Sequence, residues 1–324
     1  HPPAAEKYVP SLDAWVSAGQ TPQSLVLTSI NQTAVEEIGP IVLLPNGTAF
    51  AIGATGHTAI YMPPKADASQ PGSWATGPDF PTDTSGNKLW PILTAIDAPA
   101  CLLPHGKVMC VAGVTYGEGQ PPTYWSGPTT FFEYDPATNS FTQLANQPAT
   151  NGNDTWTARL LLLPTGEVLY SSQQNQLALY TPDPADGQPD PSWRPTITQL
   201  PQKMVPGQTY SISGTQLNGL SQAVSYGDDA QMATNYPLVQ LKNPANGAVV
   251  YLRTFNFSSL GVATGNTPQS AHVQVPMGIQ VGQWNLVVIA NGIASDPVAI
   301  EVTDQALFII DHTEHDRKTR WKHE

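Results

Sequence analysis

The sequence has few charged side chains: only 12% of its 324 residues are Asp, Glu, Lys or Arg. Proline and glycine are abundant instead, with 32 and 26 residues, and this balance favours strands and turns over helices that carry paired charges. The composition therefore predicts an all-β protein. The formal net charge of −12 makes nucleic acids and anionic membrane surfaces poor partners.

Long apolar runs are also missing. No segment approaches the ~18 consecutive apolar residues that a membrane-spanning helix needs, and no basic segment followed by an apolar stretch opens the chain. The motifs HExxH, GxSxG and CxxC and a phosphate-binding P-loop are absent. The sequence therefore offers no membrane span and none of the common short catalytic or metal-binding signatures.

Cysteine is scarce, with two residues at the ends of "CLLPHGKVMC" (101–110). A two-residue hairpin loop at His105-Gly106 would place Cys101 opposite Cys110, close enough for a disulfide. Such a bond suits an oxidising, extracytoplasmic location. The alternative is a pair of buried free thiols, which a one-residue bulge at Gly106 would produce by shifting the register.

An internal repeat organises the first part of the chain. The segments "LLPNGTAFAIG" (43–53), "LLPHGKVMCVAG" (102–113) and "LLPTGEVLYSS" (162–172) share a motif, and their prolines are 59 and 60 residues apart. Each predicts a β-hairpin around a Pro-x-Gly turn, with inner strands at 40–44, 99–103 and 159–163. Each is followed by a Tyr-x-Pro step and then by an aromatic residue, as in Tyr61 and Trp74, Tyr134 and Phe141, Tyr180 and Trp193. Four-stranded units in tandem are typical of a β-propeller.

The N-terminal segment matches only the second half of this unit. It has Tyr8-Val9-Pro10 and then Trp15, but no Pro-x-Gly hairpin precedes them. Three blades and a half blade do not close a ring. We therefore expect an N-terminal propeller portion or a complementary chain to supply the missing inner hairpin, beside residues 6–17, and the remaining blades.

The pattern changes near residue 195. Seven short runs of alternating apolar residues follow, separated by Gly, Pro and Asn turns and without the 60-residue repeat. They predict an immunoglobulin-like β-sandwich. The predicted organisation is a partial propeller over 1–194, a sandwich over 195–303 and a tail over 304–324. The tail carries His312, His315 and His323, which we interpret as part of a solvated extension rather than a metal site.

The Leu-Pro-x-Gly hairpins, followed by a sandwich that contains "YGDDAQMATNYPLVQL" and ends "VVIANGIASDPVAIEV", resemble the galactose oxidase-like, kelch-repeat proteins of the bacterial secreted type. The resemblance covers nearly all of residues 1–303. It implies a kelch-type propeller, a C-terminal immunoglobulin-like domain and an extracellular or cell-surface location. No single activity follows from this resemblance, because one fold hosts many functions.

In catalytic members of that superfamily, a Tyr-His pair before an inner strand and a His in a loop of the C-terminal domain bind copper. The resemblance places Trp156, Thr157 and Phe255 at these positions, and none of the three is a suitable copper ligand. It therefore implies a secreted, non-catalytic binding or scaffold protein without a cofactor. Two alternatives stay open: a copper-radical oxidase of a sugar alcohol or aldehyde that draws its ligands from elsewhere, and a structural subunit of a surface layer or filament.

Two sets of candidate binding residues follow from the same alignment. Phe255, with Asn256 beside it, could form an aromatic platform with Trp156 for sugar rings, whereas the alternative is that Phe255 and Phe257 pack between the two domains. Glu37 and Asp97 lie at or beside the positions equivalent to Trp156 in earlier blades. With Glu36 they could bind Ca²⁺ at one end of the central channel, although we expect solvated rim carboxylates.

Two further acidic motifs are weaker. Asp228-Asp229 could be a catalytic carboxylate pair, but Gly-Asp-Asp between two strands is more typical of a turn. The loop with Asp183, Asp186 and Asp190 is faintly similar to a calcium loop, and its spacing does not fit the EF-hand pattern.

Overall fold

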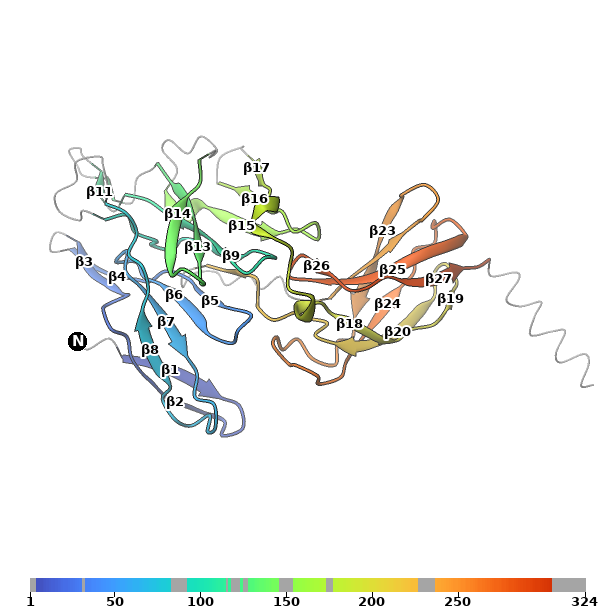
Figure 1. Ribbon diagram of the computed structural model, residues 1–324, viewed down its shortest axis with the longest axis horizontal. Coiled ribbons are helices and arrows are strands. Elements are labelled where there is room, and N and C mark those ends of the chain that lie inside the picture. Colours follow the sequence, from blue (N-terminus) through green and yellow to red (C-terminus); the bar gives the residue numbers. More distant parts are fainter. Residues whose placement is uncertain are drawn as a thin grey trace, which may run out of the picture. The chain divides into compact units, whose positions relative to one another are not determined.

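The computed structural model describes residues 4–30, 33–82, 92–114, 116–117, 123–124, 128–145, 154–172, 177–226 and 237–304. These ranges confirm the all-β prediction: they are built of strands, and their helices are three short 3-10 turns (Figure 1). None of the described helices has the length and apolar character needed to span a membrane. The 3-10 turns are η1 (Thr155–Thr157), η2 (Pro184–Asp186) and η3 (Pro191–Trp193).

The chain forms two compact units, each described by itself below. The first unit comprises His1–Asp190 and Leu220–Asn235, and the second comprises Pro191–Gly219 and Tyr236–Glu324. The sequence prediction placed a single boundary after residue 194 and did not anticipate that residues 220–235 return to the first unit.

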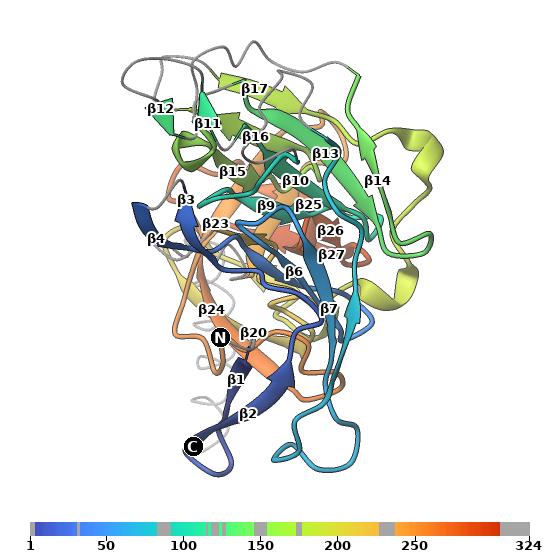
Figure 2. The same cartoon turned by 90° about the vertical axis from the view of Figure 1, so that its left-hand side faces the viewer.

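The first unit contains three antiparallel sheets that each begin with a Leu-Pro-x-Gly hairpin. They are named here the first, second and third repeats. The first is β5 (Ile41–Leu43), β6 (Ala49–Ile52), β7 (Thr58–Met62) and β8 (Ser73–Thr76); the second is β9 (Ala100–Leu102), β10 (Val108–Ala112), β13 (Thr130–Asp135) and β14 (Ser140–Gln143); the third is β15 (Arg159–Leu162), β16 (Val168–Ser171) and β17 (Leu177–Tyr180). Figure 2 shows β9, β10, β13 and β14 side by side in the order in which they pair. The three inner strands predicted from the motif spacing are confirmed.

Shorter pairs complete this unit. They are β1 (Ala4–Val9) with β2 (Ala14–Gln20), β3 (Leu27–Ile30) with β4 (Thr33–Glu37), and β11 (Tyr116–Gly117) with β12 (Thr123–Tyr124).

The three Pro-x-Gly turns have the same geometry. In each, the leucine N–H donates at 2.8 Å to the carbonyl oxygen four residues later, as Leu103 does to Lys107. The turn glycines, which are Gly47, Gly106 and Gly166, have φ angles of 82°, 94° and 86°. This left-handed conformation is easily adopted by glycine and closes a three-residue hairpin loop. The loop length sets the register of each inner hairpin.

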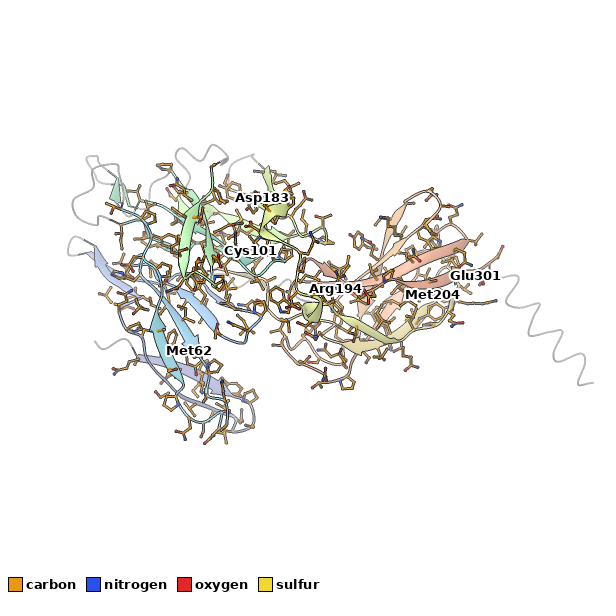
Figure 3. All side chains as sticks on the ribbon, viewed as in Figure 1. Met62, Cys101, Asp183, Arg194, Met204 and Glu301 are labelled. Atoms are coloured by element: carbon orange, nitrogen blue, oxygen red, sulfur yellow. The ribbon has the colours of Figure 1, made fainter. Side chains whose placement is uncertain are left out.

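The predicted disulfide is wrong, and the turn explains why. Because the loop has three residues instead of two, Cys101 lies opposite Met109 and Cys110 lies opposite Ala100. A shift of one residue turns the two cysteine side chains to opposite faces of the sheet. Both are buried free thiols, and burial raises the pKa of each; Figure 3 labels Cys101 among the strands of the first unit. The cysteines therefore no longer argue for an oxidising compartment.

An aromatic pair recurs at one cross-strand position. Tyr61 faces Trp74 in the first repeat, Tyr134 faces Phe141 in the second, and Tyr8 faces Trp15 in the β1–β2 hairpin. The hairpin therefore matches the outer half of a repeat, as predicted. The described residues pair no further strand with its β1 edge.

The preceding segment of chain covers two of these three pairs. Phe50 of the first repeat stacks on Tyr134 of the second, with ring centroids 3.7 Å apart. The β1–β2 hairpin lies against the first repeat, where the Trp74 indole N–H donates to the Ala18 carbonyl oxygen at 3.0 Å. The third pair, named here the Tyr8–Trp15 surface, has side chains that are 45% and 68% exposed. The first and second repeats thus pack their aromatic pairs against the segment before them. In the third repeat the described residues pair no fourth strand with β17, and Trp193, which was expected on that strand, lies in η3.

Residues 222–225 follow strands β18 to β20 (residues 196–215) of the second unit in the chain, but they contact the inner strands of the first unit. β21 (Val224–Ser225) pairs with β9, so that Val224 lies opposite Cys101. The Gln222 side chain donates to the Ile41 carbonyl oxygen at 2.9 Å, which ties the segment to β5.

The second unit is one curled nine-stranded sheet around its own core. Strand β23 pairs with β22 through its first half and with β24 through its last residues, and this switch lets the sheet turn round the buried Trp284; Figure 3 labels Met204 of the same core. The strands are β18 (Thr196–Gln199), β19 (Lys203–Met204), β20 (Thr209–Thr215), β22 (Leu238–Lys242), β23 (Val249–Phe255), β24 (Gln269–Gln274), β25 (Gly282–Ala290), β26 (Ile293–Ala294) and β27 (Val298–Val302).

Candidate functional site

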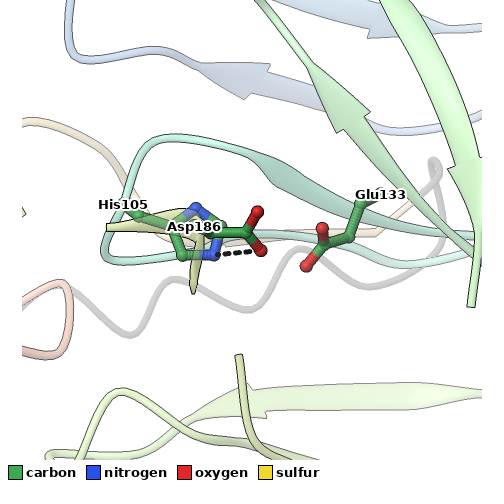
Figure 4. Close-up of side chains that lie close together, drawn as sticks. All are labelled: His105, Glu133 and Asp186. Carbon is green, nitrogen blue, oxygen red and sulfur yellow. Dashed lines mark ion pairs between the residues drawn. The ribbon is translucent and has the colours of Figure 1, made fainter. Parts of the chain in front are cut away.

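A group of three potential metal ligands lies between the second and third repeats. His105 sits in the Pro-x-Gly turn between β9 and β10, Glu133 on β13, and Asp186 at the end of η2, after β17. One ligand atom from each residue lies within 4.8 Å of the others, and Figure 4 shows the side chains converging. The group is named here the His105 cluster.

Local sequence explains how Asp186 reaches the cluster. η2 begins with Pro184, and the Asp183 carboxylate accepts a hydrogen bond from the Ala185 N–H at 2.9 Å. Proline in the first turn and a capping aspartate favour a helical turn at this point. Asp183 is therefore a cap, and the faint resemblance of this loop to a calcium loop does not describe its role.

A lysine ammonium group lies inside the His105 cluster. Lys107 Nζ is 3.3 Å from Glu133 Oε2 and also donates to Asp186 Oδ1. The Tyr180 hydroxyl donates to the other Glu133 oxygen at 2.5 Å. Burial opposes the charge of Lys107, but its hydrogen bond to Asp186 and the nearby Glu133 outweigh burial and raise its pKa. Burial and the bond to Glu133 likewise raise the pKa of Tyr180.

His105 is the one member of the cluster with an unsatisfied atom. Its side chain is only 5% exposed, and its buried Nε2 has no hydrogen-bond partner. The nearest carboxylate oxygen, Asp186 Oδ2, is 3.8 Å away, which is too long for a hydrogen bond. Nδ1 accepts a long contact of 3.4 Å from the Lys107 N–H. Burial lowers the pKa of His105 although Glu133 and Asp186 act to raise it, so the imidazole is neutral near pH 7.

The His105 cluster was not predicted from the sequence, although the repeats contain a signal for it. The first and third repeats have Asn46 and Thr165 at the turn position that His105 occupies. The residue before the repeat tyrosine is apolar in both, whereas the second repeat has Glu133 there. A position-by-position comparison of the repeats would have marked the second repeat as different.

A second group, named here the Trp156 surface, lies where the third repeat begins. It consists of Asp154, Trp156, Arg159 and Tyr226. The Trp156 indole N–H donates to Asp154 Oδ2 at 3.0 Å, and the Tyr226 hydroxyl donates to the Trp156 carbonyl oxygen at 2.5 Å. The Arg159 guanidinium donates to the same carbonyl at 2.7 Å and lies 4.2 Å from the centroid of the Tyr226 ring.

These contacts fix an aromatic residue at the surface. Trp156 is 37% exposed, whereas Tyr226, which supports its backbone, is buried. Thr157 is also buried, and its hydroxyl donates to the Asp154 carbonyl oxygen at 2.7 Å. Trp156 and Thr157 lie in η1, which Ala158 separates from β15. The polar hydrogens of both side chains are used to hold the turn.

The other predicted aromatic residue lies in the second unit. Phe255 ends β23 and meets His272 edge to face, with ring centroids 5.6 Å apart. Asn256 follows with a left-handed φ of 51°, and its amide nitrogen is 3.2 Å from His272 Nδ1. The predicted platform of Trp156 with Phe255 requires both units and stays a prediction.

Glu37 and Asp97 were expected as solvated carboxylates at one end of a central channel, and the exposure of Asp97 differs from this expectation. The Asp97 N–H donates to the Ile38 carbonyl oxygen at 3.2 Å, and the Thr155 hydroxyl donates to the Ile96 carbonyl oxygen at 2.8 Å. These contacts bring the Asp97 turn beside the end of β4, which carries Glu37, and beside η1. Asp97 is 8% exposed, so it is not the solvated rim residue that we expected.

Outside the His105 cluster, the described residues form no other set of three potential metal ligands. The remaining candidates lie outside the described residues; they are Asp228, Asp229, His312, His315 and His323.

Comparisons with known proteins give no family for this chain. No protein-family model matches it, and no curated protein matches it. Among solved structures it is similar to the crystal structure of the Lin-41 filamin domain, with 12% identity over 34% of this chain and 91% of that chain. The TM-score is 0.20. The function therefore has to be argued from the sites.

Proposed function

We propose that this chain is a secreted, non-catalytic binding protein, in which the first unit is a portion of a kelch-type β-propeller and the second is an immunoglobulin-like β-sandwich. The repeats support the first assignment, since they share one hairpin motif, one turn geometry and one aromatic position. The single curled sheet of the second unit, with its own core, supports the other assignment.

The Trp156 surface carries the binding proposal. It presents a partly exposed indole whose N–H donates to the Asp154 carboxylate, and the Arg159 guanidinium binds the backbone carbonyl oxygen of the same tryptophan. A flat aromatic group next to hydrogen-bonding groups of both signs suits a sugar ring, which has apolar faces and hydroxyl edges. Because η1 and Tyr226 already fix the tryptophan, less conformational entropy is lost on binding. We propose a glycan of the cell surface or cell wall as the ligand.

A glycan array tests this proposal. The 324-residue chain is applied in parallel with Trp156→Ala and with the control Trp15→Ala, which changes an exposed tryptophan of the same unit. The proposal expects a defined set of bound glycans that is lost in the Trp156 variant and kept in the control. Binding of no glycan by the unchanged chain, or equal binding by all three proteins, would contradict it.

The Tyr8–Trp15 surface favours a second kind of partner, namely another four-stranded repeat of the same type. The equivalent aromatic pairs are covered by the segment before them, and the β1 edge corresponds to the edge of β7 that pairs with β6. We propose that an N-terminal propeller portion or a complementary chain supplies this repeat. Edge pairing and apolar burial would together stabilise the complex.

Oxidative footprinting tests this partner. Hydroxyl-radical labelling of protein isolated from its source should modify Trp15 several-fold less than it does in the recombinant 324-residue chain. Trp74, which is half-buried in the recombinant chain, serves as the internal control. Equal labelling of Trp15 in both preparations would show that nothing covers this surface. Fractionation of the same source material tests the proposed extracellular or cell-surface location.

A further inference from the structure

We propose that His105, Glu133 and Asp186 form a binding site for a divalent transition metal of the Zn²⁺ type, which the Lys107 ammonium group fills when no metal is bound. The site is separate from the Trp156 surface and does not depend on the proposed glycan binding. It lies between the second and third repeats, so that a bound metal would join the two.

The unsatisfied histidine nitrogen is the first argument. Nε2 of His105 is buried, has no hydrogen-bond partner and faces Asp186 Oδ2 at 3.8 Å. Two ligands that each lie about 2.0–2.2 Å from one tetrahedral zinc ion are about 3.3–3.6 Å apart. The separation is therefore too long for a hydrogen bond and close to that of two ligands of one ion. A metal would give Nε2 the partner that it lacks.

The charges favour a dication. With Lys107 inside, two carboxylates face one ammonium group, which leaves one negative charge uncompensated. A divalent ion in place of the ammonium would balance both carboxylates. One imidazole nitrogen and two carboxylate oxygens suit zinc and its neighbours in the first transition row better than Mg²⁺ or Ca²⁺, which prefer oxygen ligands alone.

The surroundings fit a metal site in a further respect. The Tyr180 hydroxyl holds Glu133 Oε1, which orients the carboxylate and leaves Oε2 for the ion.

All three contacts that metal binding breaks belong to Lys107. Its ammonium must leave the carboxylates, and its side chain, at 23% exposure, already has access to solvent. A metal at Nε2 also requires the imidazole proton at Nδ1, which ends the long 3.4 Å contact from the Lys107 N–H. Lys107 therefore competes with the metal, and its removal should strengthen metal binding.

Calorimetric titration of the 324-residue chain with ZnCl₂, after treatment with EDTA and its removal, tests the site. The protein used throughout carries His312→Ala, His315→Ala and His323→Ala, because imidazole binds zinc and these three tail histidines lie outside the described residues. We expect one zinc ion per chain, and binding at least tenfold weaker with MgCl₂. In this background, Lys107→Met should bind zinc at least tenfold more tightly.

Two variants assign the site. His105→Ala should lose zinc binding, whereas the control His57→Ala, which removes a surface histidine paired with Asp79, should keep it. Circular dichroism checks that both variants fold. If His105→Ala does not fold, the visible absorption of Co²⁺ bound to the parent protein shows whether the ion has tetrahedral nitrogen and oxygen ligands. The absence of zinc binding by the parent protein up to millimolar metal, or unchanged binding by folded His105→Ala, would overturn the proposal.

Discussion

Removal of the Lys107 ammonium group should destabilise the first unit markedly, even without metal. In Lys107→Met, the side chain volume is nearly kept, but Glu133 loses its cation at a position where its side chain is only 8% exposed. Breaking a buried ion pair costs about 3–5 kcal/mol, whereas an exposed pair contributes about 0.2–1 kcal/mol. Because the side chains of Lys107 and Asp186 are 23% and 21% exposed, we expect the free energy of unfolding to fall by an intermediate amount, about 2 kcal/mol.

Urea unfolding at pH 7 with EDTA present, followed by tryptophan fluorescence, measures this loss. The two units are separate, so their transitions are analysed individually. The control is Lys203→Met, which breaks the exposed Lys203–Glu301 pair of the second unit, 3.6 Å apart with side chains 60% and 42% exposed. Lys203→Met should lower the free energy of unfolding of the second unit by less than about 1 kcal/mol.

A double variant separates the lost pair from lost packing. In Lys107→Met with Glu133→Gln, the buried carboxylate is gone, so part of the loss should be recovered. The reasoning would be refuted if Lys107→Met lowered the free energy of unfolding no more than Lys203→Met does. It would also be refuted if the double variant lost more free energy of unfolding than its two single variants lose in sum.

Three further predictions concern the first unit. Titration of the denatured, unreduced chain with a thiol reagent should find two reactive thiols, Cys101 and Cys110, and a finding of none would restore the disulfide. Phe50→Ala should lower the free energy of unfolding by about 3–5 kcal/mol, since this buried ring stacks on Tyr134, and a loss under about 1 kcal/mol would contradict that packing. Because burial lowers the pKa of His105, the unfolded chain binds its proton first as the pH falls below about 6.5, so the folded state should lose stability there. His105→Gln should remove this part of the pH dependence measured in EDTA, and an unchanged profile would count against it.

The strands could be predicted from the sequence because they follow from local patterns. The Leu-Pro-x-Gly motif specifies a hairpin, and its spacing placed the inner strands at β5, β9 and β15. The register could not be predicted with the same certainty, because it depends on whether the loop has two or three residues. Gly106 adopts a left-handed conformation and closes a three-residue loop, and in the resulting register Cys110 lies opposite Ala100 instead of Cys101.

Long-range features were beyond the sequence patterns. The Tyr226 hydroxyl donates to the backbone carbonyl oxygen of Trp156, 70 residues away in the sequence, and no periodic pattern in the sequence indicates such a contact. The His105 cluster likewise joins a turn, a strand and a 3-10 turn that are far apart in the chain. Trp156 was singled out from the sequence through a family resemblance, whereas its fixed orientation is a finding of the structure.

The proposed function depends on the Trp156 surface, and the affinity of one glycan for a series of variants tests it most directly. The tightest ligand found on the array is titrated calorimetrically into the parent chain, Trp156→Phe and Trp156→Ala. Stacking on the indole predicts an affinity that falls at least tenfold in the alanine variant, about 1.4 kcal/mol, with an intermediate loss for phenylalanine. Equal affinities in all three proteins would contradict the account.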